Sequence, residues 1–219
     1  MKAYEAVVFD LDGTLLNTLD DLWDSVNFAL EKKGYPKRSI DEVRCFVGNG
    51  VEKLMMRAVP ENTSKEDALS ALEIFKNHYK DNSKNKTRPY DGIMELLGAL
   101  KDNGFKMAIV SNKFNDAVKE LNKEFFGEYI EFAYGECETI RKKPNPDAVF
   151  KALEDLGIEQ SQAVYVGDSD VDIMTAKNSG LDCISVSWGF RTRQELEMNG
   201  AISIIDKPMD LMDIICKIC

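Results

Sequence analysis

The sequence has no apolar run long enough to cross a membrane and no excess of basic residues. A membrane-spanning helix needs about 18 consecutive apolar residues, and no segment of this chain approaches that length. Lysine and arginine together number 28, against 38 aspartates and glutamates, which gives a formal net charge of −10. Because binding to nucleic acid requires clustered positive charge, we expect neither a membrane nor a nucleic acid as a partner.

Histidine is also scarce, and the cysteines show no pairing pattern. The five cysteines are odd in number and scattered, and the single histidine, His78, lies far from the pair formed by Cys216 and Cys219. A zinc site normally takes four ligands, so we interpret this pair as part of a buried last helix. The first residues reach an aspartate-rich segment too early for a secretion signal. Reduced thiols and a cytoplasmic protein, monomeric or homodimeric, are expected.

What the sequence does contain is an alternation of short apolar runs and amphipathic segments, with 44% hydrophobic residues to build a core. Strands are predicted at residues 5–9, 106–110, 163–167 and 183–186, with weaker candidates near Phe132 and Ile204. Helical spacing predicts helices at residues 93–100, 148–156 and just before Gly180. Continuous apolar strands that alternate with helices predict a Rossmann-like, doubly wound parallel α/β sheet, whose sites lie at the carboxyl ends of its strands.

Roughly 90 residues separate the first two of these strands, far more than one crossover connection requires. Apolar spacing predicts helices over residues 19–30 and 51–58, and Ser64 with Asp67 resembles a capping box that opens a third helix. The first helix carries three acids that we interpret as an exposed face: Asp20, Asp21 and Asp24. We therefore predict two domains, an α/β core of residues 1–15 plus 88–219 and an inserted helical domain of residues 16–87.

The segment Asp10-Leu11-Asp12-Gly13-Thr14 follows the first strand. In an extended chain, carboxylates at positions i and i+2 point to the same side. One carboxylate can attack phosphorus and form an aspartyl phosphate, while the second protonates the leaving oxygen and later deprotonates the attacking water. Taken alone, the segment also fits a calcium-type loop or a plain turn.

The other strand ends favour the phosphate interpretation. Ser111 and Asn112 can donate hydrogen bonds to phosphoryl oxygens, and Lys143 lies on a proline-bounded loop where its charge suits a phosphate. Asp168 and Asp172, about one helical turn apart, add two more acids. Acids that converge beside a phosphate repel one another unless a hard cation joins them, so the sequence predicts Mg²⁺.

Together these segments resemble the four motifs of the haloacid dehalogenase superfamily, in the expected order and over essentially the whole chain. The helical insertion resembles the type of cap called C1. Within the superfamily the chain most resembles phosphoglycolate phosphatases and their close relatives. That narrower resemblance depends on three segments: Val47-Gly48-Asn49-Gly50, Ser111-Asn112-Lys113 and Lys143-Pro144-Asn145-Pro146-Asp147.

The resemblance implies a magnesium-dependent phosphomonoester hydrolase that acts on a small phosphorylated metabolite through an aspartyl phosphate. Asp10 would be the nucleophile and Asp12 the general acid and base. Ser111 and Lys143 would bind the transferring phosphoryl group. The metal would be held by the Asp10 carboxylate, the Asp12 backbone carbonyl and Asp168, with Asp172 supporting the site from behind.

Several of these residues have a second interpretation. Ser111 could cap a helix, and Asn112 could contribute only its backbone amide to phosphate binding. Thr14 is a further candidate for the phosphate site, where it could bond a neighbouring carboxylate or serve as a turn hydroxyl. Asp172 could be an acid that the dipole of its helix favours.

The insertion contributes candidates for substrate binding. Gly48 and Asn49 are predicted to close over the substrate with backbone amides, or to form a plain turn before a helix. Arg44, Lys53 and Arg57 are candidate anchors for a substrate carboxylate, although residues of this kind in such an insertion are more often solvated.

Other functions use similar residues. A phosphotransferase like β-phosphoglucomutase would need Asp10 and Asp12 but would protect the phospho-enzyme from water. An inorganic pyrophosphatase, or another small-phosphate phosphatase of the superfamily, is a further alternative. A phospho-acceptor signalling domain would lack the insertion, and a non-catalytic binding protein should have lost one of the acids.

Overall fold

The computed structural model describes residues 4–216, and the chain divides into two compact units. Among the described residues the core comprises 4–16 and 89–216, and the insertion comprises 17–88. Among the described residues, no helix combines the length and the apolar content needed to cross a lipid bilayer.

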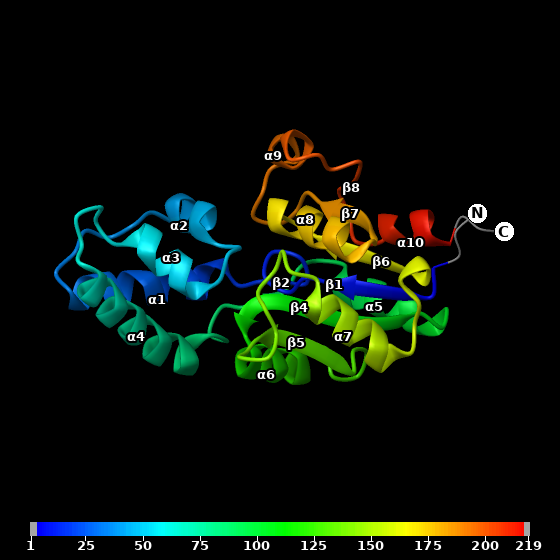
Figure 1. Cartoon of the computed structure of the whole chain (residues 1–219), viewed down its shortest axis with the longest axis horizontal. Helices are drawn as coiled ribbons and strands as arrows, with labels where there is room; N and C mark the ends of the chain where they lie inside the picture. Colours follow the sequence, from blue (N-terminus) through cyan, green and yellow to red (C-terminus); the bar gives the residue numbers. More distant parts are fainter. Residues whose placement is uncertain (1–3, 217–219) are drawn as a thin grey trace. The chain divides into compact units, whose positions relative to one another are not determined.

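A six-stranded parallel sheet forms the centre of the core (Figure 1). The strands lie in the order β5-β4-β1-β6-β7-β8. Their bounds are Ala6–Phe9 (β1), Lys106–Phe114 (β4), Phe132–Glu136 (β5), Ala163–Gly167 (β6), Asp182–Val186 (β7) and Ser203–Ile205 (β8). The predicted doubly wound α/β fold is confirmed, and the two weaker strand candidates are strands as well.

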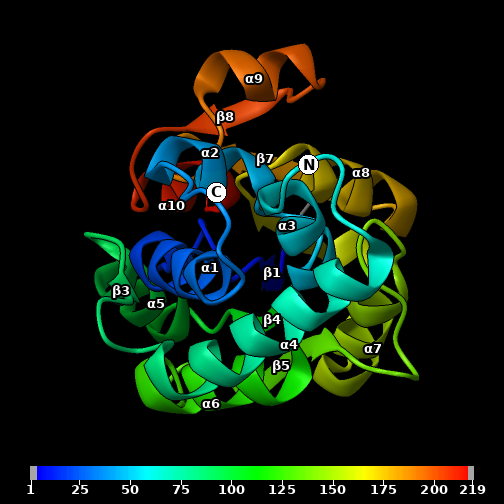
Figure 2. The ribbon, with the colours of Figure 1, turned by 90° about the vertical axis from the view of Figure 1, so that its left-hand side faces the viewer.

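Helices cover both faces of this sheet because side chains alternate along each strand. Val7 and Phe9 of β1 pack into one apolar layer, and Ala6 and Val8 pack into the other. The first layer includes α5 (Ile93–Asp102), α6 (Asn115–Phe125) and α10 (Asp210–Ile215); the second includes α7 (Asp147–Leu156) and α8 (Asp170–Ser179). Figure 2 shows α5 and α10 on one side of the sheet and α7 and α8 on the other. A short helix, α9 (Arg193–Met198), follows β7.

Strand β4 is longer than its apolar run. The run ends at Val110, but the strand continues through Ser111, Asn112 and Lys113, while its pairing with β5 is interrupted between Val110 and Phe114. Helix α6 begins only after Phe114, so the interpretation of Ser111 as a helix cap is wrong. The three polar side chains are buried, and their hydrogen bonds allow the extended backbone to carry them into the interior.

The insertion consists of four helices, between the short paired strands β2 (Leu16–Asn17) and β3 (Arg88–Pro89). The helices are α1 (Leu19–Lys32), α2 (Ile40–Phe46), α3 (Val51–Ala58) and α4 (Lys65–Asn82). Ser64 caps α4 and accepts from the Asp67 N–H, as the sequence predicts. The apolar spacing did not predict α2, but Ser39 and Glu42 form a reciprocal capping box at its start, which was the available signal.

Asp21 of α1 is buried and does not belong to an exposed acidic face. Its side-chain oxygens accept hydrogen bonds from the N–H of Lys86, each at 3.0 Å, and from the N–H of Thr87 at 2.8 Å. The returning end of the insertion therefore covers this position of α1. The prediction was wrong for Asp21 because helical spacing does not reveal which distant segment packs on a helix.

The last helix has the apolar side predicted for it. Leu211 and Ile215 of α10 are buried in the core, and Cys216 is exposed with a free thiol. Cys219 lies outside the described residues, and the prediction for the cysteine pair therefore stays a prediction.

Candidate active site

Asp10 lies at the carboxyl edge of the sheet, directly after the central strand. The register of the parallel strands sets Phe9 opposite Ile109 of β4 and Val166 of β6. The Asp10 N–H donates to the Val166 carbonyl at 2.9 Å. Because β4, β1 and β6 are neighbours, the residues that follow them meet at one edge.

A buried lysine joins two acids at this edge. Lys143 Nζ donates to Asp10 Oδ1 at 2.6 Å, to Asp172 Oδ1 at 2.7 Å and to the Tyr165 hydroxyl at 3.1 Å. The Tyr165 hydroxyl in turn donates to Asp172 Oδ1 at 3.0 Å. Lys143 and Asp10 are each 6% exposed. Tyr165, in the middle of β6, was not predicted as a site residue, because an apolar strand run gives no sign of a buried hydroxyl contact.

Asn112 fixes the loop that carries Lys143. Its side chain accepts from the Lys143 N–H at 2.7 Å and donates to the Lys143 carbonyl at 3.1 Å. The side chain thus positions the lysine, and a contact from Asn112 to phosphate through its backbone amide stays a prediction.

Asp168 lies in a pocket bounded by two glycines. Its Oδ2 accepts from the Phe190 N–H at 2.6 Å. A Cβ atom at Gly13, whose φ is +92°, would lie 2.3 Å from Asp168 Oδ2, and one at Gly189 would lie 2.3 Å from Asp168 Cβ. Larger residues would therefore displace the carboxylate. Gly189 was not predicted; its place in the turn after β7 was the available signal.

Asp172 belongs to the cap of α8 and to the acidic cluster at the same time. Ser169 caps the helix, and the Asp172 Oδ2 atom accepts from the Ser169 hydroxyl at 2.5 Å and from its N–H at 3.1 Å. Because Oδ1 accepts from Lys143 and Tyr165, both carboxylate oxygens have protein donors. This arrangement fits an acid at the start of its helix, and the supporting role of Asp172 at a metal site stays a prediction.

Asp12 is paired with a second buried lysine. Lys113 Nζ donates to Asp12 Oδ1 at 2.7 Å, and the Lys113 N–H donates to Ser111 Oγ at 3.1 Å. Lys113 was not predicted as a site residue and appeared only within the segment Ser111-Asn112-Lys113. A lysine that follows two polar residues gives no sign in the sequence that it is buried.

Thr14 is buried beside these groups. Among the described residues its hydroxyl has no hydrogen-bond partner, so the expected bond to a neighbouring carboxylate is not formed. Its carbonyl accepts from the Trp188 indole N–H at 3.0 Å. A contact between the Thr14 hydroxyl and a phosphate stays a prediction.

Burial and mutual repulsion govern the protonation of the cluster. Burial raises the pKa of Asp10 well above its usual value; Lys143 opposes this shift, and Asp172 and Asp168 add to it. Burial, reinforced by Asp172, raises the pKa of Asp168 to about 7. Burial disfavours the charge of Lys143, yet Asp10 and Asp172 raise the pKa of its ammonium well above the usual value. The site therefore favours one more positive charge near its acids.

The donors at this edge fit a hard divalent cation. Carboxylate oxygens of Asp10, Asp168 and Asp172 lie within 4.8 Å of one another, and oxygen ligands are those that Mg²⁺ prefers. A divalent ion would also balance the surplus of acids over ammonium groups. That surplus arises from four acids and two lysines: Asp10, Asp12, Asp168 and Asp172 with Lys113 and Lys143.

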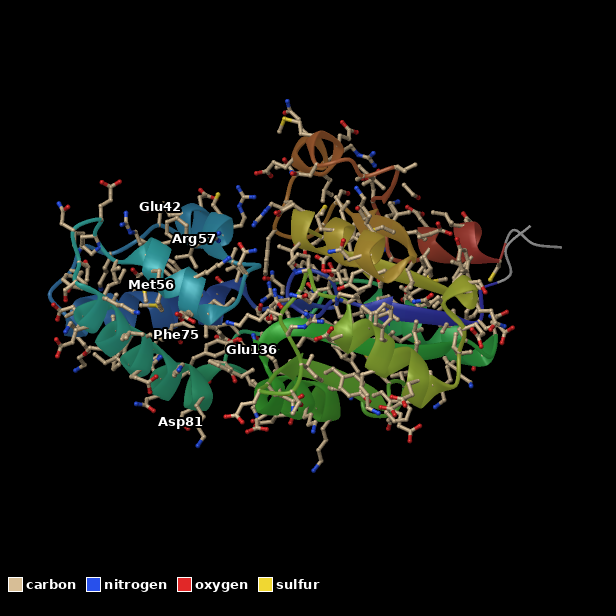
Figure 3. All side chains as sticks on the ribbon, viewed as in Figure 1. Glu42, Met56, Arg57, Phe75, Asp81 and Glu136 are labelled. Atoms are coloured by element: carbon tan, nitrogen blue, oxygen red, sulfur yellow. The ribbon has the colours of Figure 1, made fainter. Side chains whose placement is uncertain are left out.

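In the insertion, an arginine holds the loop between α2 and α3. Arg57, labelled in Figure 3, donates to the Phe46 carbonyl and to Asn49 Oδ1, each at 2.8 Å. Gly48 and Gly50 have φ values of +120° and +86°, which glycine adopts without strain. Arg57 therefore maintains the loop conformation instead of presenting a free cation. Substrate contacts from Gly48 and Asn49 stay predictions.

Comparisons with known proteins agree with this architecture. The family model of haloacid dehalogenase-like hydrolases matches residues 7–186. The phosphoglycolate phosphatase of Aquifex aeolicus is 33% identical over 209 residues, which cover 94% of each chain. Phosphoglycolate phosphatase 1 of Pseudomonas aeruginosa is 33% identical over 212 residues, or 94% of this chain and 78% of that protein. The crystal structure of a protein from Lactobacillus delbrueckii subsp. bulgaricus superposes on this chain with a TM-score of 0.94. The two chains are 37% identical, and the superposition covers 98% of this chain and 99% of the other.

Proposed function

The chain belongs to the haloacid dehalogenase-like hydrolases, and from this premise we propose that it is a phosphatase that hydrolyses small phosphomonoesters through an aspartyl phosphate. The observation that carries the proposal is the contact between Asp10 and the buried Lys143 at the carboxyl edge of the sheet, with a second acid, Asp12, two residues further on. This arrangement joins a nucleophile, a fixed positive charge and a proton carrier.

In the first step, a carboxylate oxygen of Asp10 attacks phosphorus. A bond forms between that oxygen and phosphorus while the bond from phosphorus to the ester oxygen breaks. Asp12 gives its proton to the departing oxygen, so the alcohol leaves in neutral form. Lys143 stabilises the negative charge of the transferring group because its ammonium is already in place before the reaction.

In the second step, Asp12 is a carboxylate and acts as a base. It removes a proton from a water molecule whose oxygen attacks the phosphorus of the aspartyl phosphate. The bond between phosphorus and Asp10 breaks, which releases phosphate and restores the Asp10 carboxylate. Asp12 ends this step protonated and ready for the next substrate.

Mg²⁺ is the cation that we propose for the acidic cluster, where it would neutralise charge on the phosphoryl oxygens when bound. The Asp10 carboxylate, the Asp12 backbone carbonyl and Asp168 would hold it. Asp172 would support the site by keeping Lys143 in place, and Ser111 would donate a hydrogen bond to the phosphoryl group.

We further propose 2-phosphoglycolate as the preferred substrate, with the insertion as the cap that selects it. The support is similarity to relatives named phosphoglycolate phosphatases over nearly the whole chain. The carboxylate of this substrate needs a cationic partner. Arg57 is engaged with its own loop, and Arg44 lies 3.8 Å from Asp41 in an ion pair within α2. Lys53, which is exposed on α3, is therefore the candidate that we favour.

Phosphate release from a panel of phosphomonoesters, with and without Mg²⁺, tests this function. The panel should include 2-phosphoglycolate and sugar phosphates, with the anhydride pyrophosphate as an additional compound. Asp10→Asn should lower kcat by about 10³-fold or more, because the amide cannot attack phosphorus. Asp102→Asn is the matched control, since Asp102 is an exposed acid at the end of α5 and should leave kcat unchanged.

The outcomes separate the general claim from the narrower one. Magnesium-dependent release that Asp10→Asn abolishes supports the aspartyl-phosphate mechanism, and a preference for 2-phosphoglycolate supports the substrate. A preference for another ester rejects only the substrate. Release from none of the compounds, or release unaffected by Asp10→Asn, rejects the proposed phosphatase.

A further inference from the structure

The ion pair between Lys113 and Asp12 joins two residues that lie 101 positions apart in the sequence. Strands β1 and β4 are parallel neighbours, and their register sets Phe9 opposite Ile109. Beyond this pair both chains run toward the same edge of the sheet, where β1 ends at Phe9 and β4 continues to Phe114, which brings Asp12 and Lys113 together. The two-step reaction proposed above makes no direct use of Lys113.

Lys113 is firmly placed. Its N–H donates to Ser111 Oγ, and its side chain is only 3% exposed, against 14% for that of Asp12. A buried ammonium and its carboxylate partner resist separation, because separation leaves both charges without compensation. Lys113 therefore holds Asp12 at Oδ1, while the Asp12 side chain stays partly accessible to solvent.

We propose that Lys113 is a positioning residue for Asp12, an inference that rests on the proposed function. By binding Oδ1, Lys113 fixes the rotation of the carboxyl group and therefore the direction in which Asp12 presents its proton. A general acid must lie within hydrogen-bond reach of the oxygen that it protonates. Displacement of a reacting group by about 1 Å can cost about 10²-fold in rate. Lys113 transfers no proton in this scheme.

This role makes the effect of Lys113 depend on the leaving group. An alkoxide is strongly basic and must be protonated as it departs, whereas 4-nitrophenolate is weakly basic and departs without that help. The ratio kcat/KM reports the steps up to formation of the aspartyl phosphate, in which Asp12 acts as an acid. A misplaced Asp12 therefore lowers kcat/KM for alkyl esters more than for aryl esters, and a general loss of structure lowers both alike.

The experiment measures kcat/KM of the full chain with Mg²⁺ for whichever alkyl phosphate the panel identifies and for 4-nitrophenyl phosphate. Lys113→Met should lower the value for the alkyl ester by about 10-fold to 10²-fold and that for the aryl ester by less than about 3-fold. Lys113→Arg keeps a charged donor and should therefore retain most of the wild-type kcat/KM for the alkyl ester. In an Asp12→Asn background, Lys113→Met should have little further effect on the alkyl ester, because the two residues act together.

Lys106→Met is the matched control. Lys106 lies at the other end of β4, where its Nζ donates to the Leu156 carbonyl, and its loss should leave the ratio between the two substrates unchanged. If Lys113→Met shows no cooperative transition in a thermal unfolding experiment, Lys113→Gln provides the same comparison. An equal loss for both esters, or no loss for either, overturns the positioning role. A wild-type protein that hydrolyses neither ester rejects the proposed function instead, and with it the role that depends on it.

Discussion

Asp10 in the core and Asp21 in the insertion are both buried carboxylates, but they have opposite kinds of partners. Asp21, 1% exposed, accepts hydrogen bonds from the backbone N–H groups of Lys86 and Thr87. Asp10, 6% exposed, shares the Lys143 ammonium with Asp172. The backbone donors around Asp21 satisfy its carboxylate, and Asp21 in turn fastens two segments of the insertion together. A lysine shared between acids leaves negative charge that a metal ion could neutralise.

The same difference extends to the neighbouring polar groups. In the insertion, Asn27 accepts from the Arg38 N–H at 2.8 Å and donates to the Arg38 carbonyl at 3.0 Å. In the core, Lys113 and Asp12 bind each other through their side chains. These residues of the insertion thus fasten its chain segments together, whereas the charged pair of the core holds opposite charges close to one another. Burial of a charged residue alone does not identify a site; the type of partner does.

Removal of the shared lysine is the strongest way to break this comparison. Lys143→Met should lower kcat by about 10²-fold to 10³-fold, because a fixed positive charge at the transferring group is lost. In the presence of a chelator it should also lower the free energy of unfolding by about 3–5 kcal/mol, because the buried acids lose their common cation. Steady-state kinetics and denaturant unfolding measure the two effects.

The neighbouring lysine provides the control. Lys142 pairs with Glu136 (labelled in Figure 3) at 2.8 Å, with their side chains 32% and 23% exposed. Lys142→Met should therefore cost at most about 1 kcal/mol and leave kcat unchanged. Equal effects of the two substitutions would contradict the distinction between a shared lysine in the site and an ordinary ion pair.

The fold could be predicted from the sequence because its strands are apolar on both faces and end in chemically distinctive residues. Local patterns also identified Asp10, Lys143 and Asp168, whose motifs are continuous in the chain. They did not reveal the contacts that depend on distant segments. Lys113 meets Asp12 only through strand register.

Two other features depend on the same kind of long-range packing. Gly189 is required because Asp168 and the backbone carbonyl of Gly13 both pack against it. Asp21 was predicted to be exposed because helical spacing identifies a face of a helix but not the segment that covers it. Residues whose role depends on tertiary neighbours are therefore those that the sequence leaves undetermined.

The acid in the insertion should affect stability and not chemistry. Asp21→Asn replaces one accepting oxygen with an amino group that faces backbone N–H donors, so it should lower the free energy of unfolding by about 1–3 kcal/mol. The value of kcat should stay within about 2-fold of wild type. Asp20→Asn, one residue earlier on the same helix, should change the stability by no more than about 0.5 kcal/mol. A large loss of kcat in Asp21→Asn with unchanged stability would contradict the claim that Asp21 serves stability while Asp10 serves the chemistry.

The smallest expected effect concerns pH and the acids of the core. The pKa of Asp168 is raised from an ordinary value of 3.8 to about 7 in the folded chain. Between these values the folded state holds a proton that the unfolded state has lost. The stability that this group contributes is therefore fully present below the unfolded pKa and is lost as pH rises through the folded one. Asp10 shifts in the same direction.

A divalent ion should reverse this trend, because it binds the ionised acids and competes with protons for them. We expect the Tm measured with a chelator to fall by a few degrees between about pH 5 and about pH 8, and the increase in Tm on adding Mg²⁺ to be larger at the higher pH. Asp168→Asn should flatten the dependence of the chelated protein and weaken the response to Mg²⁺, whereas Asp21→Asn should preserve both. An unchanged pH dependence in Asp168→Asn would mean that the acids at the sheet edge do not control it, because that substitution removes the titrating group and preserves the shape of the side chain.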